Sequence, residues 1–148
     1  MTGANNSNTF KTQRDFIHPA AEIYAAFANG DKLARWWGPE GFSNTFHQFE
    51  FKQDGLWQFT MHGPDGNSYP NESYFSELIP AQKIVIRHNC MPFFTLSIEL
   101  QALSAGTRLV WQQTFDDAAV AAALQHIVEP ANEQNLDRLQ RVLNADFN

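Results

Sequence analysis

The sequence has little of what secreted, membrane-spanning or nucleic-acid-binding proteins need. Cys90 is its single cysteine, which excludes an intrachain disulfide and suits a reducing compartment. The net charge of −6 argues against nucleic-acid backbones and anionic membrane surfaces as main partners. No apolar run approaches the length of a transmembrane helix, and residues 1–8 lack the apolar core of a secretory signal. We therefore expect a cytoplasmic protein with no nucleic-acid and no membrane partner.

Sequence motifs for metal, nucleotide or serine-hydrolase chemistry are also missing. The five histidines show no His-x-His or His-Glu-x-x-His spacing, and there is no second cysteine to complete a zinc site. No Gly-x-Gly-x-x-Gly, Walker loop or Gly-x-Ser-x-Gly elbow occurs. The segment Gly63-Pro64-Asp65-Gly66 is a tight turn and not a phosphate cradle, because no helix follows it. We expect no metal and no cofactor, and nothing in the sequence identifies an enzyme.

The length and the hydrophobic pattern indicate one domain rich in strands. A chain of 148 residues is ordinary for one domain and can bury about two-thirds of its unfolded surface. Short runs of aromatic and β-branched residues alternate with turn signals such as Asp54-Gly55, which is typical of antiparallel strands. We expect residues 9–148 to form this domain, after a disordered segment at residues 1–8. The predicted strands span residues 9–16, 45–52, 56–62, 68–79, 83–88, 93–103 and 107–115.

Helical signals follow the first strand and occupy the end of the chain. Pro19 lies in the first turn of one short helix, and Asp31 is placed to cap a second that runs to Trp37. From Asp117 onward, apolar residues recur at helical spacing, but Pro130 should break or kink this helix because it lacks an N–H and clashes with the preceding turn. The predicted apolar stripe comprises Val120, Leu124, Ile127, Ala131, Leu136, Leu139 and Leu143.

Four motifs, in this order, resemble one known family. They are Trp36-Trp37-Gly38-Pro39, Asp54-Gly55-x-Trp57, Gly63-Pro64-Asp65-Gly66-x-x-Tyr69-Pro70-Asn71-Glu72 and Gln134-Asn135-Leu136-Asp137-Arg138-Leu139. The chain is similar over nearly its whole length to the bacterial set named after the C-terminal domain of the activator of heat shock protein 90 ATPase, within the START/birch-pollen-allergen-like (SRPBCC) superfamily. The resemblance and the element order together imply an α+β helix-grip fold. This is a curved seven-stranded antiparallel sheet with two short helices after strand 1 and a long C-terminal helix packed across the sheet.

The many aromatic residues on the strands predict either a tightly filled core or an internal pocket. Alternation along each strand indicates which side chains face the closing helix, and a few of these are polar. An apolar pocket with a few convergent polar groups is the usual layout of a small-ligand site. A β-bulge would reverse the faces of a strand. The candidate pocket residues are Trp37, His47, Phe49, Phe51, Trp57, Phe59, Met61, Glu72, Tyr74, Ile86, His88, Leu96, Ile98, Trp111, Gln113 and Leu124.

The polar candidates also have ordinary structural explanations. His47 and His88 suit hydrogen-bonded positions near strand ends, and Glu72 can bond nearby backbone or lie at a pocket rim. Cys90 follows His88 closely, but no third group is in place to orient such a pair, so a lone thiol is the better interpretation. The pair Asp116-Asp117 precedes the last helix, where it can cap the helix and complement its dipole.

Three functions follow from the resemblance and from these residues. The first is non-catalytic binding of a small hydrophobic molecule between the sheet and the C-terminal helix, which the superfamily implies most generally. The second is a co-chaperone-like interaction module that stimulates a heat shock protein 90 ATPase, so that a chaperone is a possible partner. The third is an enzyme of the cyclase or dehydratase type that uses His88 or Glu72. An internal void favours the first and third, and a filled core with an exposed apolar patch favours the second. The oligomeric state stays open.

Overall fold

The computed structural model describes residues 8–146, and its elements follow the predicted order. Residues 1–7, which belong to the segment expected to be disordered, lie outside the described residues. The order of elements confirms the predicted α+β helix-grip fold. The elements are β1 (Thr9–Phe16), α1 (Ala20–Ala28), α2 (Gly30–Trp36), β2 (Ser43–Phe49), β3 (Leu56–His62), β4 (Ser68–Ile79), β5 (Lys83–His88), β6 (Phe94–Leu103), β7 (Gly106–Phe115) and α3 (Ala118–Asp146).

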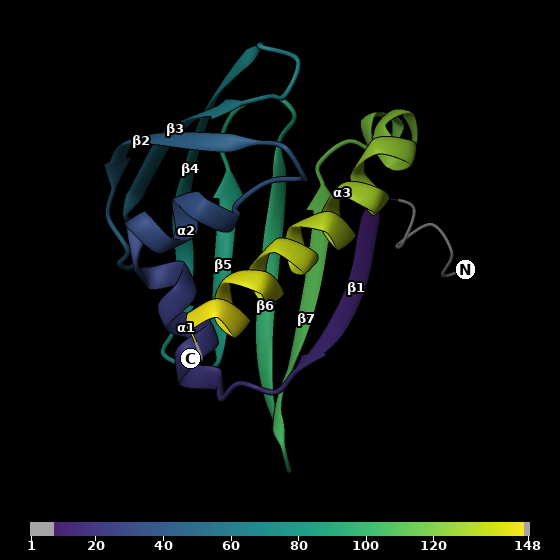
Figure 1. Cartoon of the computed structure of the whole chain (residues 1–148). Coiled ribbons are helices and arrows are strands. Elements are labelled where there is room, and N and C mark those ends of the chain that lie inside the picture. The colour runs from purple at the N-terminus through teal and green to yellow at the C-terminus, as the bar shows by residue number, and fades with distance from the viewer. Residues whose placement is uncertain (1–7, 147–148) are drawn as a thin grey trace, which may run out of the picture.

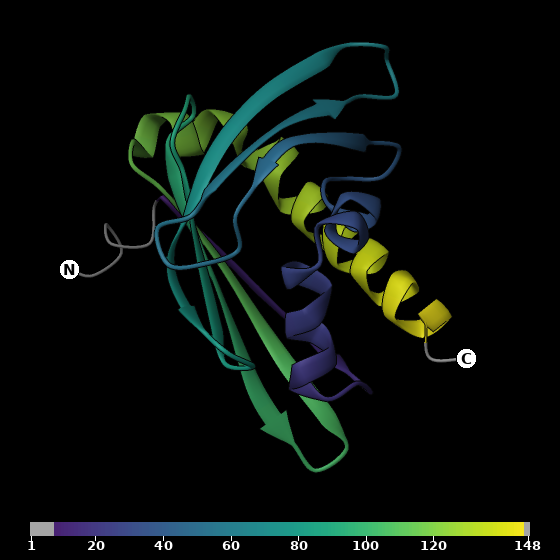
Figure 2. The same cartoon turned by 90° about the vertical axis from the view of Figure 1, so that its left-hand side faces the viewer.

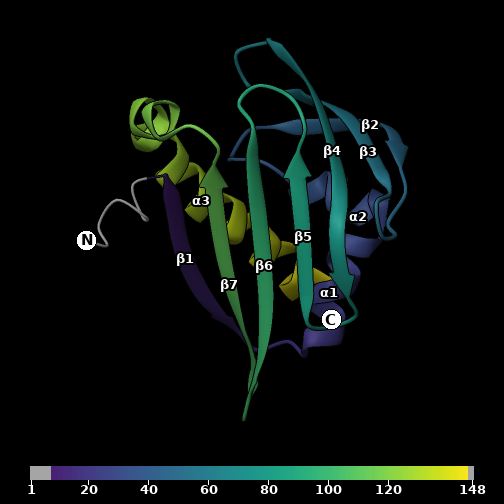
Figure 3. The same cartoon turned by 180° about the vertical axis from the view of Figure 1, so that it is seen from behind.

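The seven strands form one antiparallel sheet whose helices all lie on the same face. The strand order is β1-β7-β6-β5-β4-β3-β2, so β1 and β2 are the two edges. Helix α3 crosses this face diagonally beside α1 and α2 (Figure 1), while none of the helices in residues 8–146 covers the opposite face (Figure 3). The strands β2 and β3 and the adjoining part of β4 curve over toward the helices (Figure 2). Within residues 8–146, no helix combines the length and apolar character needed to cross a membrane.

The core fills the concave side of the sheet and is dominated by aromatic rings. Trp57 is fully buried, and its ring stacks on Phe59 and Phe75 with centroid distances of 4.3 and 5.8 Å. The C-terminal half of α3 contributes Leu136 and Leu139, both with no exposed surface. Burying a side chain of this size contributes roughly 1.5–3 kcal/mol, so these contacts hold α3 against the sheet.

Helix α3 is continuous through Pro130 but changes direction. Its assignment runs unbroken from Ala118 to Asp146, and Figure 2 shows a shorter N-terminal part at an angle to the longer C-terminal part. The missing N–H and the ring of Pro130 account for a bend of this kind. The two parts of the helix pack against different clusters. Ala121, in the N-terminal part, packs with Phe10 and Phe115 rather than with the main core. The predicted apolar stripe is wrong at Ile127, which is 55% exposed.

Strand β2 contains a bulge that overturns the predicted position of His47. The register with β3 shifts between Phe46 and Gln48, so that Phe46 pairs with Phe59 and Phe49 with Trp57. The extra residue, His47, therefore points to the outer face, where its Nε2 lies 2.8 Å from Thr60 Oγ1. The side chain of Phe46, next to it in the chain, packs against the core.

Strand β4 has the opposite phase from the one predicted. Ser73 pairs with the inward-facing Trp57, which places Glu72 and Tyr74 on the outer face. There, Glu72 accepts a hydrogen bond from Gln58 Nε2 at 3.0 Å, across the same strand pair. Residues directly opposite each other in an antiparallel pair share a face, so the inward positions are Asn71, Ser73 and Phe75.

Two predicted helix caps also differ in detail. Asn29, and not Asp31, caps α2, because its side chain accepts a hydrogen bond from Lys32 N at 3.0 Å. Asp117 caps α3 through Ala119 N at 2.8 Å, as expected. Its neighbour Asp116 instead makes a two-pronged contact with Arg87, with distances of 2.8 and 2.7 Å.

Candidate functional site

A partly open cavity of about 240 Å³ lies between the sheet and the middle of α3. The sheet supplies side chains from β3, β4, β5, β6 and β7, and the segment after α2 closes one side. Most of these side chains are buried, and the cavity opens partly to the surface. The lining residues are Trp37, Gly38, Pro39, Phe59, Met61, Asn71, Ser73, Ile86, His88, Pro92, Phe94, Leu96, Trp111, Gln113, Ala131, Asn132 and Asn135.

Half of the residues proposed from the sequence line this cavity. One of them comes from the segment after α2. The others come from strands in which side chains point alternately to the two faces of the sheet without interruption. They are Trp37, Phe59, Met61, Ile86, His88, Leu96, Trp111 and Gln113.

The other eight proposed residues lie elsewhere. Trp57 and Ile98 belong to the fully buried core, and Phe49 and Phe51 pack against it at the curved end of the sheet. Leu124 lies in the small cluster with Phe10, because α3 bends away from the cavity before Pro130. As described above, the bulge and the strand phase turn the remaining three to the outer face: His47, Glu72 and Tyr74.

Several lining residues were not among the candidates. Asn71 and Ser73 are polar although they face inward, so the polar pattern of β4 assigns its two faces the wrong way round. The apolar Phe75, in the same strand, is the residue that indicates the correct inward face. Asn132 and Asn135 lie on α3, and no local pattern tells which helix side chains meet a void. The remaining missed residues are Gly38, Pro39, Pro92, Phe94 and Ala131.

The segment that closes the cavity is bound to α3 by the last of the four motifs. The guanidinium of Arg138 donates to the backbone carbonyls of Arg35, Trp37, Gly38, Pro39 and Phe42 at 2.9–3.0 Å. This residue closes the exposed carbonyl end of α2, where a cation is electrostatically favoured. Burial lowers the pKa of Arg138, which the nearby Glu40 carboxylate opposes.

Asn135 provides a second link between α3 and this segment. Its amide nitrogen donates to Trp36 O at 2.9 Å, and its carbonyl oxygen accepts from Gly38 N at 3.2 Å. Gly38 has φ of +96°, and a Cβ there would lie 2.7 Å from Met61 Cε, so a side chain at this position would intrude on the cavity wall. The motifs Trp36-Trp37-Gly38-Pro39 and Gln134 to Leu139 thus form one structural unit.

His88 is the only titratable side chain in the lining, and both of its ring nitrogens are engaged. Nδ1 lies 2.7 Å from Pro92 O, and Nε2 lies 2.7 Å from Asn71 Oδ1. The ring is 6% exposed and stacks on Phe94 with a centroid distance of 4.4 Å. Burial lowers the pKa of His88, and the hydrogen bond to Pro92 opposes that shift.

The lowered pKa of His88 predicts a loss of stability in mild acid. The unfolded chain, with an ordinary histidine pKa of about 6.5, takes up the proton first as the pH falls. The free energy of unfolding should therefore decrease below about pH 6.5. His88 stops lowering the free energy of unfolding once its side chain is protonated in the folded protein as well. His88→Gln should flatten this part of the curve in urea titrations between pH 7 and 5. The same change at the exposed His47 controls for loss of a histidine, and an identical slope in wild type and His88→Gln would contradict the prediction.

Cys90 contacts His88 just after the end of β5. Its Sγ lies 3.4 Å from His88 Nε2, the same nitrogen that faces Asn71 Oδ1 at 2.7 Å. Pro92 O can only accept a hydrogen bond, so the proton of the neutral ring lies on Nδ1, and Nε2 can accept from the Cys90 thiol. Cys90 also lies beside the outer face of the sheet, next to Glu72, and does not line the internal cavity. The contact between these two residues is therefore not part of the cavity site.

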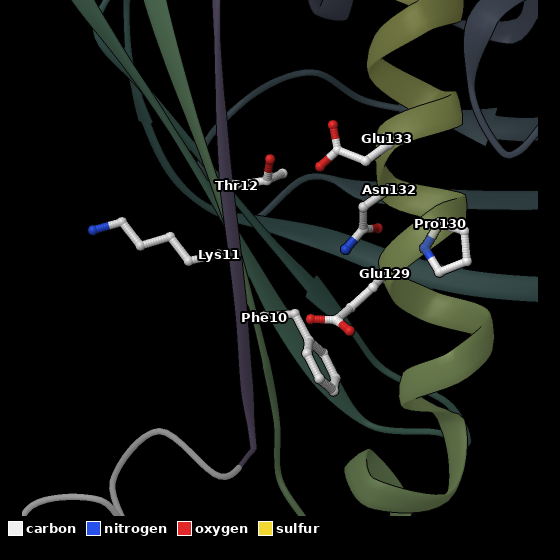
Figure 4. Close-up of a pocket in the computed structure, with 7 residues that line it drawn as sticks. All are labelled: Phe10, Lys11, Thr12, Glu129, Pro130, Asn132 and Glu133. Atoms are coloured by element: carbon white, nitrogen blue, oxygen red, sulfur yellow. The ribbon is translucent and has the colours of Figure 1, made fainter.

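A second depression, of about 310 Å³, runs along the surface between β1 and α3 (Figure 4). Phe10 and the carboxylate of Glu129 lie toward each other across it, while Lys11 points away from α3. Arg14, farther along β1, makes ion pairs with Glu133 and Asp137 at 3.2 and 2.6 Å. These groups tie the edge strand to α3, so we assign this groove a structural role.

The internal cavity offers binding groups but no charged ones. Its lining contains no Asp, Glu, Lys or Arg. In the part of the chain that the structure describes, no cluster of three or more His, Cys, Asp or Glu residues could hold a metal ion. The arrangement can bury an apolar molecule and meet one or two polar atoms, but it presents no acid–base pair.

A curved antiparallel sheet closed by a long C-terminal helix over an internal cavity defines the helix-grip class of the SRPBCC superfamily. The profile of the family described as "Activator of Hsp90 ATPase homolog 1-like protein" matches residues 18–144, and the chain belongs to this family. The similarity suggested by the four motifs is thereby confirmed. No protein of curated function matches the sequence.

Solved structures of several bacterial proteins share the fold at low sequence identity. A protein from Nitrosomonas europaea superposes with a TM-score of 0.88 at 18% identity, over 95% of this chain and 97% of that one. A protein from Chromobacterium violaceum gives 0.81 at 23% identity, over 91% and 96%. An AHSA1 protein from Silicibacter pomeroyi gives 0.74 at 18% identity, over 93% and 99%. At these identities the similarity establishes the fold alone.

Proposed function

We propose that this protein binds a small hydrophobic molecule, without catalysing a reaction, in the cavity between the sheet and α3. The observation that carries the proposal is the 240 Å³ cavity itself, which extends from the surface into an otherwise filled aromatic core. Protein interiors are packed to crystal-like density, and an unfilled void costs stability. A site for a ligand accounts for a void that packing alone would remove.

The lining supports binding rather than catalysis. It contains no carboxylate, and its only titratable group, His88, is held by Pro92 and Asn71. General acid–base catalysis needs a group free to exchange a proton with the substrate. The earlier candidates for that role are His88 and Glu72, and Glu72 lies on the other face of the sheet.

Occupation of the cavity can be tested by filling it. The neutral fluorophore N-phenyl-1-naphthylamine should bind wild type in a saturable way. Leu96→Trp should weaken that binding at least about tenfold, because the larger side chain of this lining residue occupies the space. Leu100→Trp is the matched control: it lies on the same strand and the same face, but outside the lining, and should retain binding.

The outcomes of this titration separate the alternatives. Equal weakening by both substitutions would indicate a general effect on the fold, and unchanged binding in Leu96→Trp would place the fluorophore elsewhere. No binding below millimolar concentrations in wild type would contradict the proposal. Native mass spectrometry of the protein from its own host can then identify a co-purified ligand.

The family description favours a second function, stimulation of a heat shock protein 90 ATPase. Met91 and Phe93, in the β5–β6 connection, are 73% and 38% exposed and could contact a partner. We place this candidate below ligand binding because the core contains a void and is not completely filled. An ATPase assay with the chaperone of the same organism tests it: a rise in rate that Met91→Ser and Phe93→Ser abolish would support it, and an unchanged rate would exclude it.

A further inference from the structure

One buried glutamine of the cavity wall has hydrogen-bonding capacity that the protein does not use. The buried positions of β7 are Thr107, Leu109, Trp111, Gln113 and Phe115. The hydroxyl of Thr107 donates to a backbone carbonyl at 2.8 Å, whereas the carboxamide of Gln113 is only half used. A polar group that is buried without a full set of hydrogen bonds costs stability, so a glutamine at this position calls for a partner from outside the protein.

The protein supplies a partner for only one of the two polar atoms of this amide. Asn132 Nδ2, on α3, donates to Gln113 Oε1 at 3.1 Å. Gln113 Nε2 has no hydrogen-bond partner among residues 8–146, and Asn132 Oδ1 accepts no hydrogen bond from the same part of the chain. The two amides thus leave one donor group and one acceptor free. Rotating both amide planes by 180° would leave the same combination.

The free nitrogen of Gln113 is open to the cavity, unlike two unpaired indole nitrogens of the same sheet. Trp57 Nε1 and Trp111 Nε1 also lack a partner, but both atoms are sealed from a molecule as small as water. Gln113 Nε2 is not sealed in this way, although its residue is only 8% exposed, and Gln113 lines the cavity. The accessible surface of this amide therefore faces the cavity, where a ligand can reach it.

The amide pair lies on the open side of the cavity. Asn132 is half-buried and borders both the cavity and the groove between β1 and α3 (Figure 4). In contrast, the lining rings of Trp37, Phe59 and Trp111 are buried. A ligand with one polar end would place that end against the amide pair and its apolar part against the buried rings.

The charge of the wall restricts the ligand further. No Lys or Arg lines the cavity to pair with an anion, and no Asp or Glu to pair with a cation. Arg138, near the segment after α2, is occupied by five backbone carbonyls. A charged ligand would therefore lose its hydration without gaining a partner, which strongly disfavours it.

We infer that the cavity takes an uncharged, largely apolar molecule with one hydroxyl or carboxamide group, and that the free amide atoms of Gln113 and Asn132 bind this group. A hydroxyl and a carboxamide each donate and accept a hydrogen bond, which matches the one donor group and one acceptor that the amide pair leaves free. This inference rests on the proposed function and specifies its ligand.

The test uses two probes of nearly equal shape, 2-naphthol and 2-methylnaphthalene, of which only the first carries a hydroxyl. Displacement of N-phenyl-1-naphthylamine gives the affinity of each probe. Because the two probes leave water with different ease, the quantity compared between proteins is the ratio of their affinities. Gln113→Met removes both polar atoms at nearly constant size. It should shift the ratio against 2-naphthol about three- to tenfold, the range expected for one hydrogen bond.

A matched control and two further measurements assign the effect. Gln112→Met changes the neighbouring residue, which points to the outer face of β7 and does not line the cavity, and should leave the ratio unchanged. In a ¹⁵N-labelled wild type, the side-chain amide signal of Gln113 should move with 2-naphthol and much less with 2-methylnaphthalene. If Gln113→Met fails to fold, this signal decides the question. The anion 2-naphthoate should bind wild type at least about tenfold more weakly than 2-naphthol.

Each contrary outcome has a distinct meaning. Equal ratios in wild type and Gln113→Met, with both probes still bound, would overturn the inference and leave the proposed function standing. An equal shift in Gln112→Met would indicate a general effect on the sheet and overturn the assignment to Gln113. Binding of 2-naphthoate as tight as that of 2-naphthol would overturn the restriction to uncharged ligands. Absence of binding by either probe and by the fluorophore would contradict the proposed function itself.

Discussion

Truncation of Trp111 to alanine should lower the free energy of unfolding by about 3 kcal/mol, the lower end of the 3–5 kcal/mol range for buried aromatic residues. Trp111 is 2% exposed and pairs across the sheet with Ile98 and Thr12, so its removal leaves a large void between β7 and α3. The loss should be at the lower end because the side chain already borders a cavity, and its unpaired N–H contributes nothing favourable.

Trp57→Ala is the matched comparison for this prediction. Trp57 has no exposed surface and contacts Trp37 at 5.1 Å in addition to its two stacked phenylalanines. Its truncation should cost nearer to 5 kcal/mol, because every side of the ring is packed. Urea denaturation of the three proteins measures both losses. A loss below about 1 kcal/mol for Trp111→Ala would mean that its ring does not support the fold.

Replacement of Arg138 by methionine should destabilise the protein by roughly 2–4 kcal/mol and weaken ligand binding at the same time. The guanidinium serves five backbone carbonyls between Arg35 and Phe42, and bonds to a charged donor contribute more than neutral ones. Methionine keeps most of the apolar length but satisfies none of these carbonyls. Because the same segment carries Trp37 and Pro39 into the cavity wall, its loosening should also lower affinity for the fluorophore.

Arg141→Met, one turn farther along α3, is the control. Arg141 is 61% exposed and makes one surface ion pair with Glu40 at 2.7 Å, and exposed pairs of this kind add little to stability. The change should leave binding intact and alter stability far less than Arg138→Met does. Arg138→Lys should be more stable than Arg138→Met but less stable than wild type, because an ammonium group cannot reproduce the planar, two-pronged donor geometry of the guanidinium. Equal effects of the Arg138 and Arg141 substitutions would refute a special role for Arg138.

Where a strand is regular, alternation in the sequence placed its side chains correctly. Phe59, Met61, Ile86, His88, Leu96, Trp111 and Gln113 lie in runs whose inward positions are mostly apolar, and all of them line the cavity. The predicted ends of each strand also lie close to the observed ends, because turn residues such as Asp54-Gly55 end a strand through their own backbone conformation. Gly55 is required there by a close approach, since a Cβ would collide with the carbonyl oxygen of Glu50.

The same alternation failed where the sheet departs from an ordinary core. Asn71 and Ser73 are polar and face inward, so they mimic the outer face of β4, and a bulge at His47 reverses part of β2. Both departures occur next to the cavity or at the curved edge of the sheet, where a regular apolar strand would have filled the interior. The pattern in the sequence therefore misleads where polar residues face inward or a bulge interrupts the strand.

The sequence by itself determined the family, the order of the elements and the absence of metal and nucleotide motifs, because these depend on residue type and local spacing. Only the tertiary structure decided which side chains surround a void, since that depends on the bend of α3 at Pro130 and on the distance between the helix and the sheet. Likewise, the role of Arg138 became clear only when Arg35 to Phe42 lay beside it, about a hundred residues away in the chain. Contacts of this range are set by how layers pack, and no local pattern encodes them.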